Sequence, residues 1–347
     1  MAATIKDVAR AANVSISTVS RVTSNAPNVS SEIRKRVLRA IAKLGYTPSV
    51  IAKSLAMRSL RHIAVLMGRT KEQAFANPDF MQMLDGLSTG LNKHGYNLVL
   101  CTNGDQQAEM CHCMNLVLTG AVQGAVVIGS FRNDPLLERL VEARTPFVLI
   151  GFPSGQPDIH SMPYNSVGTD DYADCYEAVR YLIGLGHRRV GIIYSSLEYT
   201  VNRMRYMGYL DAVADHHLAA EPQLMVEATY AKESARSAAM RLLSLPQLPT
   251  AVFCTDDYKA ANVLSVAAEK NLRVPDDVSV MGHNDYDIST MTYPTLTTVH
   301  VPLLHLGSNA ADLVVQAITH PDEPNKNILL PSYIVKRDSV AAPPARP

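Results

Sequence analysis

The stretch from Ser15 to Arg21 carries the residue types that can read a nucleic acid. Serine and threonine hydroxyls and an arginine guanidinium are groups that contact base edges and phosphates. The apolar spacing predicts a short helix in which Val19 and Val22 point back toward a small core. The side chains left facing outward are Ile16, Ser17, Thr18 and Arg21.

This helix follows another short helix, expected from Ile5 to Ala12, across a tight turn at Asn13. Two short helices joined in this way form a helix-turn-helix, whose second helix enters the major groove of DNA. Thr4 can cap the first helix in a capping box with Asp7, and Ser15 can cap the second. Ser30 can cap a third helix that ends at Gly45. Its expected apolar stripe is Ile33, Val37, Ile41 and Leu44.

The zero net charge of the chain hides a strong asymmetry. Residues 1–60 contain ten Lys and Arg against two acids, whereas the remaining residues contain 22 basic and 30 acidic side chains. A basic head on an acidic body is expected when one end of a chain meets a polyanion. The alternative is a solvated basic surface, which charge alone does not exclude.

The composition excludes several other classes. With 347 residues, of which 47% are hydrophobic, the chain needs two or three cores. We expect no membrane span, because no window holds eighteen apolar residues. Charged residues near the N-terminus interrupt any signal core, which favours the cytosol. The five scattered cysteines favour reduced thiols, and Cys111-His112-Cys113 lacks a second ligand pair. We therefore expect no metal and no cofactor.

After Arg61 the sequence alternates apolar runs with helical patterns, which is typical of parallel strands joined by crossover helices. Two such series predict two doubly wound α/β units with a ligand cleft between them. The expected strands are 63–68, 97–101, 125–129, 147–151, 190–194, 251–254 and 278–282. The expected helices are 80–94, 105–118, 135–143, 172–186, 201–216, 232–245, 259–272 and 306–318.

These elements predict a small all-α helix-turn-helix headpiece followed by an α/β core. The headpiece covers 1–46, and a linker with a short hinge helix covers 47–61. The core covers 62–340, and the tail 341–347 has a disordered composition. Within the core, the first subdomain is expected at about 62–161 plus 292–320, and the second at about 162–291 plus 321–340.

The chain resembles the LacI/GalR family of bacterial transcriptional regulators over nearly its whole length. The resemblance begins with 4–9, 14–15 and 18–21 and continues in Gly45-Tyr46-Thr47-Pro48. In the body it lies in 185–191, 274–282 and 294–299. It implies a homodimeric repressor, most often of a carbohydrate operon, that binds double-stranded operator DNA and a small-molecule effector.

In the headpiece, the resemblance makes Ile16 and Ser17 the main base-reading pair and Arg21 a further reader or phosphate contact. Leu55 matches the hinge leucine that is wedged into the minor groove, although an ordinary packing role is the alternative. Ala52 would let two hinge helices approach closely. The implied DNA-contacting set is Thr4, Ser15, Ile16, Ser17, Thr18, Ser20, Arg21, Ser30, Ala52, Lys53 and Leu55.

The body resembles periplasmic sugar-binding proteins. Phe80 matches an aromatic residue at the cleft mouth, and Arg205 a cleft arginine that grips a ligand hydroxyl or carboxylate. Acids and amides around one aromatic ring suit a polyol, which indicates a sugar or sugar derivative. Asp170 and Asp257 could instead cap the helices that follow them. The implied effector set is Phe80, Asp170, Arg205, Asp256, Asp257, Asn284 and Asp285.

The sequence departs from the family pattern at a few positions. Asn262 replaces a usual glycine, His283 and Asn284 change the polarity of the cleft, and tryptophan is absent. No leucine heptad follows residue 340, so a tetramerising tail is not expected. These departures concern the effector class more than the fold.

Two other functional classes fit the sequence less well. A solute-binding protein without DNA function conflicts with the basic headpiece and the missing signal core. An enzyme conflicts with the lack of a Gly-x-Ser-x-Gly elbow and of a phosphate-binding loop. His187 lies in a turn between a helix and a strand, which favours a structural role.

Overall fold

The structure is a computed structural model that describes residues 4–23, 29–45, 60–67, 78–102, 106–131, 134–152 and 162–343. The chain divides into two compact units, Met1–Leu60 and Arg61–Pro347. Each unit has a buried apolar core of its own.

The first unit contains three helices within its described residues. Thr4 caps the first helix in a capping box, because Thr4 Oγ1 accepts a hydrogen bond from the Asp7 backbone and Asp7 accepts one from the Thr4 backbone. Ser30 Oγ accepts a hydrogen bond from the Ile33 backbone at 3.4 Å and caps the third helix. Gly45 ends this helix at a φ of +59°, where glycine is tolerated best. The helices are α1 (Ile5–Ala12), α2 (Ile16–Thr23) and α3 (Ser31–Leu44).

The core of the first unit is small and aliphatic. Val8, Val19 and Val37 are fully buried, one from each helix. The expected stripe of α3 is wrong at its last member, since Leu44 is 37% exposed. The eight-residue helices α1 and α2 are much shorter than the 14-residue α3, so they cover only part of its length.

The second unit begins with a lobe built on a fully parallel six-stranded sheet, which we call the first lobe. Its strand order is β11-β5-β4-β3-β1-β2, with helices packed on both faces. The strands are β1 (His62–Met67), β2 (Asn97–Cys101), β3 (Gly124–Ile128), β4 (Phe147–Ile150), β5 (Asn165–Gly168) and β11 (Asn327–Leu329). The helices are α6 (Pro78–Lys93), α7 (Gln106–Leu118), α8 (Pro135–Glu142) and α14 (Leu303–Thr319).

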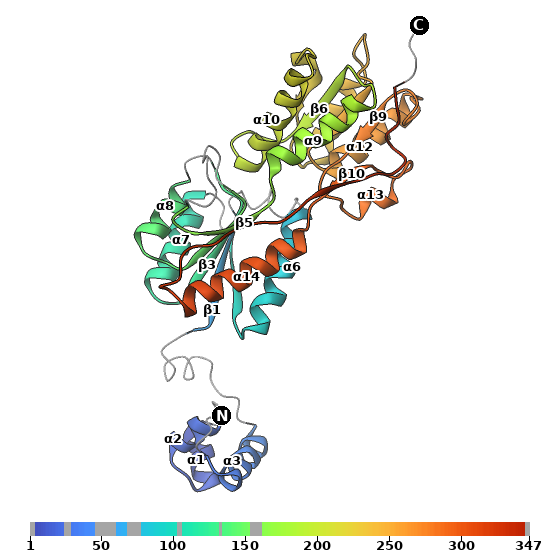
Figure 1. Ribbon diagram of the computed structural model, residues 1–347. Helices are drawn as coiled ribbons and strands as arrows, with labels where there is room; N and C mark the ends of the chain where they lie inside the picture. Colours follow the sequence, from blue (N-terminus) through green and yellow to red (C-terminus); the bar gives the residue numbers. More distant parts are fainter. Residues whose placement is uncertain are drawn as a thin grey trace. The chain divides into compact units, whose positions relative to one another are not determined.

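Successive residues of β1 face opposite sides of this sheet. Ile63 and Val65 join the apolar cluster that α6 and α14 cover, whereas Ala64 and Leu66 join the cluster under α7 and α8. Because both faces are buried, the strand reads as an unbroken apolar run and not as an alternating pattern. Figure 1 shows α6 and α14 side by side, and glycines allow their close approach. A Cβ atom at Gly307 would lie 2.0 Å from the Met83 carbonyl oxygen.

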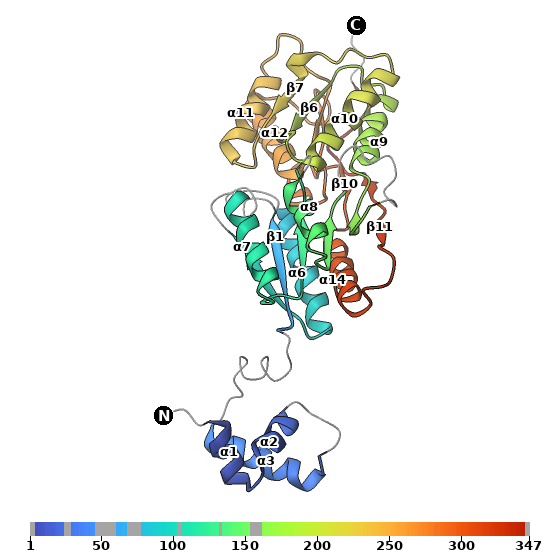
Figure 2. The same cartoon turned by 90° about the vertical axis from the view of Figure 1, so that its left-hand side faces the viewer.

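The other lobe, which we call the second lobe, is built on a parallel four-stranded sheet of order β7-β6-β8-β9. Helices α11 and α12 pack on one face and α9 and α10 on the other (Figure 2). The strands are β6 (Val190–Tyr194), β7 (Met225–Glu227), β8 (Ala251–Cys254) and β9 (Ser279–Met281). The helices are α9 (Asp171–Gly184), α10 (Thr200–Asp215), α11 (Lys232–Leu242) and α12 (Asp257–Glu269), with the short η2 (Pro222–Leu224) and α13 (Ile288–Met291).

The fold class expected from the sequence is confirmed, but two expected lobe boundaries are wrong. Strand β5 lies in the first lobe, although the sequence places residues 162–291 in the second. Strand β11 also lies in the first lobe, although the sequence places residues 321–340 in the second. The chain therefore crosses between the lobes after β5. It crosses again through an antiparallel pair of short strands, β10 (Thr298–His300) and β12 (Tyr333–Val335).

The start expected for the disordered tail, residue 341, is wrong, because Ala341 is hydrogen-bonded to the second lobe. The Ala341 carbonyl accepts hydrogen bonds from the ring of His187 at 2.9 Å and from Ser279 at 3.1 Å. The other ring nitrogen of His187 lies 3.0 Å from Thr250 Oγ1. His187 therefore ties the end of the second lobe to its sheet, which is a structural role. Residues 344–347 lie outside the described residues.

Candidate nucleic-acid interface and ligand pocket

The outer face of α2 is polar and accessible. Val19 and Val22 are buried under α1 and α3, whereas Ile16 is 45% exposed. Ser15 caps the helix, because its Oγ accepts a hydrogen bond from the Thr18 backbone at 3.1 Å. The hydroxyls on this face also contact one another, with Ser15 Oγ 2.8 Å from both Ser17 Oγ and Thr18 Oγ1. Ser17 and Arg21 are exposed, and Ser20 is half-buried.

Basic side chains flank this face on both neighbouring helices. Lys6 and Arg10 are exposed on α1, and α3 adds exposed Lys35, Arg39 and Lys43. Positive charge around an exposed polar helix suits the phosphates of a duplex. The expected hinge residues Ala52, Lys53 and Leu55 lie outside the described residues.

In the second unit, a pocket lies at the carboxyl ends of the first-lobe strands. It has about 760 Å³ of empty space, its open mouth included, and we call it the apolar pocket because ten of its lining residues have apolar side chains. These are Met67, Phe80, Met83, Ile128, Ile150, Phe152, Val201, Val301, Leu303 and Leu306. The polar lining consists of Asp79, Ser130, Thr169, Asp171 and Arg205, with backbone from three glycines.

Arg205 is the central polar group of this pocket. It is 6% exposed, its Nε donates to Asp171 Oδ1 at 2.9 Å, and its Nη1 donates to the Thr255 carbonyl at 2.8 Å. Burial works to lower the pKa of Arg205, but the Asp171 carboxylate outweighs it and the pKa is raised. Nη2 makes no hydrogen bond to any residue that the structure describes. This nitrogen can donate to a ligand oxygen.

Of the expected effector residues, Phe80 and Arg205 line the apolar pocket. Asp170 does not, because it is exposed and caps α9 through the Ala173 backbone at 2.9 Å. The next residue, Asp171, faces the pocket instead. One residue along a helix start changes the direction of a side chain by about 100°.

The other expected effector acids bind protein groups. Asp257 accepts hydrogen bonds from the Tyr286 backbone at 2.6 Å and from Thr298 Oγ1 at 2.6 Å. Burial raises the pKa of Asp257 to about 8, against the effect of these two bonds. Asp285 pairs with Arg337 at 2.8 Å and with the His300 ring at 3.1 Å. Burial works to raise the pKa of Asp285, but these partners hold it below its usual value.

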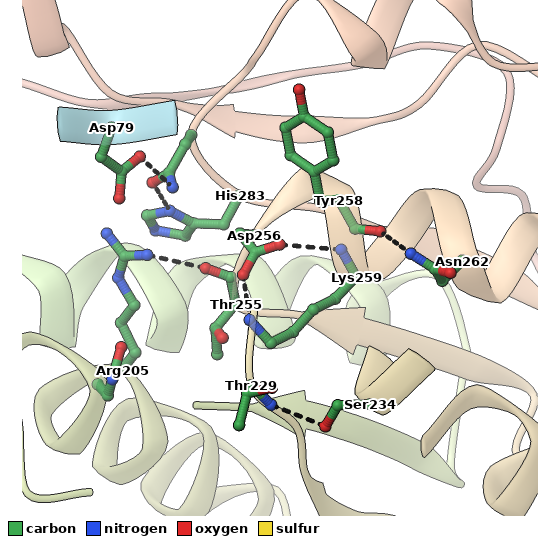
Figure 3. Close-up of polar contacts among 12 residues, drawn as sticks. Asp79, Arg205, Thr229, Ser234, Thr255, Asp256, Tyr258, Lys259, Asn262 and His283 are labelled. Atoms are coloured by element: carbon green, nitrogen blue, oxygen red, sulfur yellow. Dashed lines mark hydrogen bonds and ion pairs between the residues drawn. The ribbon is translucent and has the colours of Figure 1, made fainter. Parts of the chain in front are cut away.

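Asp256 and Asn284 are likewise bonded within the protein. Asp256 caps α12 and forms an ion pair with Lys259. Asn284 Nδ2 donates to Asp79 Oδ1 at 2.9 Å, and its Oδ1 lies 2.7 Å from His283 Nδ1 (Figure 3). Burial lowers the pKa of His283 well below its usual value. Asp256, Asp257, Asn284 and Asp285 therefore do not line the apolar pocket, and their contact with an effector stays a prediction.

Sequence reasoning missed Asp79, Ser130, Thr169 and Asp171. Ser130 and Thr169 each follow a glycine at the end of a first-lobe strand, which is where ligands bind in parallel sheets. That position was a usable signal. Nothing in the sequence indicates that Asp79 faces the pocket, because it is set by the docking of α6.

Within the described ranges, no group of three or more His, Cys, Asp or Glu side chains could hold a metal ion. Cys111 is exposed whereas Cys113 is buried, so the two thiols do not share an accessible site. None of the described helices is both long and apolar enough to cross a membrane.

Comparison with known proteins agrees with this architecture. Residues 4–49 match the family described as bacterial regulatory proteins of the lacI family, and residues 179–340 match a periplasmic binding protein-like domain. The ribose operon repressor of Haemophilus influenzae is 32% identical over 339 residues, which is 97% of this chain and 98% of that protein.

The chain belongs to the LacI family. The repressor PurR of an Escherichia coli strain is also 32% identical, over 99% of this chain and 98% of its own length. A solved lac repressor dimer bound to operator and the anti-inducer ONPF matches with 25% identity and a TM-score of 0.86, over 99% of this chain and 100% of that one. A CelR–cellobiose complex matches with 28% identity and a TM-score of 0.73, over 97% and 99%.

Family membership fixes the general activity. The chain is a DNA-binding transcriptional repressor and not an enzyme. Its two units correspond to the two matched regions, a LacI-type headpiece and a binding-protein-like core.

Proposed function

We propose that the chain represses transcription as a homodimer that acts on a carbohydrate-utilisation operon, under the control of a small molecule that binds the apolar pocket. The observation that carries the proposal is Arg205, a buried arginine that faces a ligand-sized pocket and keeps one donor nitrogen unbonded among the described residues. A buried cation with a spare donor is costly unless a ligand or solvent completes its hydrogen bonds.

In the headpiece, the DNA-reading set is the one expected from the sequence, centred on Ile16, Ser17 and Arg21. Their exposure on α2 supports base contacts in the major groove. Isoleucine can contact only a thymine methyl group, so one headpiece alone should bind weakly. Two headpieces on a pseudo-palindrome supply the specificity. Thr4 and Ser30 cap helices and can also contact phosphates.

The hinge is proposed to place a Leu55 wedge from each protomer in the minor groove, with Ala52 and Lys53 beside it. A wedge kinks the duplex and is offset by wider protein contact. Leu55→Ala should lower operator affinity and leave effector binding unchanged. Equal operator affinity of the two proteins in a salt-controlled titration would exclude the wedge.

Exposed apolar side chains support the dimer. Met81 on α6 and Leu304 on α14 lie on the surface of the same helix pair, and Met291 and Tyr293 are exposed at the end of α13. Apolar side chains that gather on one surface can mark an association interface, whereas a single exposed apolar side chain is ordinary. Tyr293→Asp should shift sedimentation toward the monomer at micromolar concentration, whereas Leu118→Asp, on another exposed leucine, should not.

For the effector, we propose a sugar or sugar derivative. Hydroxyls can accept from Arg205 and donate to Asp79 or Asp171, while Phe80 covers an apolar face of the ring. A flat heterocycle is the second candidate, because the lining is more apolar than a free polyol needs. One relative is named a ribose operon repressor and another PurR, so the relatives' names leave both classes open.

Control would follow from linkage between the lobes and the hinge. An effector that binds one arrangement of the lobes more tightly than the other shifts the chain toward that arrangement and so changes its affinity for the operator. A coupling free energy of about 1–3 kcal/mol changes operator affinity roughly 5- to 150-fold. We propose that the protein acts in the bacterial cytoplasm on the nucleoid.

The test has two stages. Selection from random duplexes with the full chain should recover a pseudo-palindrome, and Ile16→Ala or Arg21→Gln should weaken binding to it more than the core variant Lys270→Gln. A melting-shift screen of sugars, sugar derivatives and nucleobases, repeated with operator, should then identify the effector and the sign of its coupling. A chain that binds sugars but recovers no DNA sequence would instead be a solute-binding protein.

A further inference from the structure

A second pocket opens in the second lobe, and we call it the Lys259 pocket. Its lining comes from the loop between β7 and α11, from the start of α11, and from α12 with its capping residue, with Ile288 at one edge. Eight of its eleven lining residues carry a polar or charged group in the side chain. The lining residues are Thr229, Tyr230, Lys232, Ala235, Asp256, Tyr258, Lys259, Ala261, Asn262, Ser265 and Ile288.

Lys259 is the unusual member of this lining. The residue is only 1% exposed, although lysine is almost never fully buried without a partner. Its ammonium forms an ion pair with Asp256 and lies 4.4 Å from the centre of the Tyr230 ring. Figure 3 shows the Lys259 side chain turning back beneath Asp256, which brings the ammonium to the side of Thr229.

In the pair of Lys259 and Asp256, the carboxylate uses more of its hydrogen-bonding capacity than the ammonium does. Asp256 uses both carboxylate oxygens on Lys259, one for the backbone N–H at 2.9 Å and the other for the ammonium. The ammonium has three donors, and Asp256 Oδ2 is its one hydrogen-bond acceptor among the residues that the structure describes. Lys259 therefore keeps donors for a further acceptor, whereas Asp256 has little acceptor capacity left for a ligand.

The charges around the pocket favour an anion. Lys259 and the exposed Lys232 contribute two positive charges against one negative charge from Asp256. Neutral donors add to them from Tyr258 and Ser265. A buried ammonium strengthens its hydrogen bonds to an anionic acceptor, because water competes less inside a pocket.

The pocket walls are held in place by bonds of their own. Thr229 N donates to Ser234 Oγ at 3.0 Å, and Ala231 N donates to Thr229 Oγ1 at 3.3 Å, which fixes the loop before α11. On α12, Asn262 Nδ2 donates to the Tyr258 carbonyl at 2.8 Å. The amide orientation at Asn262 is thereby set, and its Oδ1 is available to a ligand donor. A site with fixed walls loses little entropy on binding.

The segment Thr255–Asp256 separates this pocket from the apolar pocket. Arg205 bonds the Thr255 carbonyl from one side, and Lys259 bonds the Asp256 carboxylate from the other (Figure 3). A ligand that changes the Lys259–Asp256 pair would therefore act on the same short segment that holds Arg205.

We propose that the Lys259 pocket binds an anionic group, a carboxylate or a phosphoryl group, of a small molecule. Lys259 is the buried cation that contacts the anion, Lys232 adds charge at the rim, and the amide of Asn262 and the hydroxyl of Ser265 bond the neutral part of the ligand. The inference rests on the proposed function only in that the core is taken to bind small molecules.

The test compares matched ligand pairs by calorimetry on the full chain, without DNA. D-Ribose 5-phosphate against D-ribose reports a phosphoryl preference, and D-gluconate against D-glucose reports a carboxylate preference. Inorganic phosphate reports binding of the bare anion. In at least one pair, the anionic member should bind about tenfold tighter, as expected for a charge-assisted hydrogen bond in a pocket.

Three variants test which residues cause the preference for the anionic ligand. Lys232→Gln, at an exposed position, should reduce it about threefold, as a screened charge would. The joint change Lys259→Met with Asp256→Asn removes the pair without leaving a buried charge, and it should abolish the preference. Lys270→Gln, on a half-buried lysine that follows the last residue of α12 and does not line the pocket, should leave the preference unchanged.

Equal affinity within both pairs, or a preference that survives in both the Lys232 variant and the joint variant, would overturn the proposal. Should the joint variant fail to fold, as judged by its melting transition, Lys232→Gln and the salt dependence of the preference decide the matter. Loss of operator binding affects none of these measurements, so failure of the proposed function is recognised separately.

Discussion

Asp79 Oδ1 accepts a hydrogen bond of 2.9 Å from Asn284 Nδ2, 205 positions further along the chain. Asp79 lies on α6 of the first lobe, and Asn284 lies just after β9 of the second. Tyr286 donates its hydroxyl to the same carboxylate oxygen. Asn284 and Asp285 both have positive φ angles, of 95° and 59°, a strained region for residues other than glycine. The bonds to Asp79 help to hold this strained turn against the other lobe.

Removing the carboxylate should weaken this contact between the lobes. Asp79→Ala leaves two buried donors without their acceptor, so we expect a loss of about 1–3 kcal/mol in the free energy of unfolding. Tyr286→Phe should cost less, because Asn284 still reaches Asp79. Urea unfolding of the two single variants and the double variant gives the coupling energy, for which we expect about 0.5–3 kcal/mol. Strict additivity would show that Asp79 and Tyr286 act independently.

The pair of Arg205 and Asp171 gives a second prediction. Their side chains are 7% and 15% exposed, so Arg205→Met leaves a nearly buried carboxylate without its partner. We expect a loss of about 3–5 kcal/mol, measured by chemical unfolding. Adding Asp171→Asn should restore part of that stability but none of the effector affinity. Stability of the single variant equal to the parent would mean that solvent reaches Asp171 freely.

The buried carboxyl of Asp257 predicts a pH dependence of stability. Its pKa of about 8 lies far above that of an unfolded aspartate, about 3.9. Between these values the folded chain holds a proton that the unfolded chain has released, so stability falls as pH rises. Burial also raises the pKa of Asp174, to about 6, and lowers the pKa of His283. Both groups therefore affect stability mainly in the lower part of the pH range between the two pKa values of Asp257.

The measurement for Asp257 is the melting temperature from about pH 6.5 to 8.5, a range chosen from these pKa values. The parent protein should lose stability across it, and Asp257→Asn should flatten the dependence. Asp277→Asn is the matched control, because Arg273 holds the pKa of Asp277 at about 2 and it does not titrate in this range. Parallel curves for the parent and Asp257→Asn would contradict the assignment.

The glycines between α6 and α14 give a prediction with an internal control. A Cβ atom at Gly307 would lie 2.0 Å from a backbone oxygen of α6, which a side-chain rotation cannot relieve. Gly307→Ala should therefore cost about 1–3 kcal/mol or more through overpacking. At Gly184, at the end of α9, nothing lies within 4 Å of the added atom. Gly184→Ala should be neutral or slightly stabilising, by up to about 1 kcal/mol, and melting temperatures compare the two.

The sequence predicted the long helices and the continuously apolar strands well, and it missed several short strands that lack such a pattern. Four-residue β5 and three-residue β11 have no pattern that distinguishes them from loops, because their pairing depends on a sheet that other segments build. β11 is the edge strand of the first-lobe sheet and β5 lies next to it, so both lobe boundaries expected from the sequence are wrong. Capping at Thr4 and Ser30 was correct because it depends on residues three positions apart.

In the ligand pocket, motif positions identified Phe80 and Arg205 but not the groups around them. Asp257 and Asn284 occupy expected cleft positions, yet their oxygens and nitrogens bond to Thr298 and Asp79 from distant segments. Such partners become neighbours only through tertiary packing. A residue type at a family position therefore indicates the chemistry that is available there and not the partner that uses it.

The order of segments in the first lobe has a consequence for synthesis. Helix α14 shares a buried cluster with Leu87 and Leu91 of α6, but it begins only at Leu303, after every strand of the second lobe. A ribosome delivers the chain from its N-terminus, so the second lobe can complete its sheet while α6 still lacks its partner. Nascent chains that stop before Leu303 expose the apolar face of α6, and these are the intermediates on which a chaperone would act during translation.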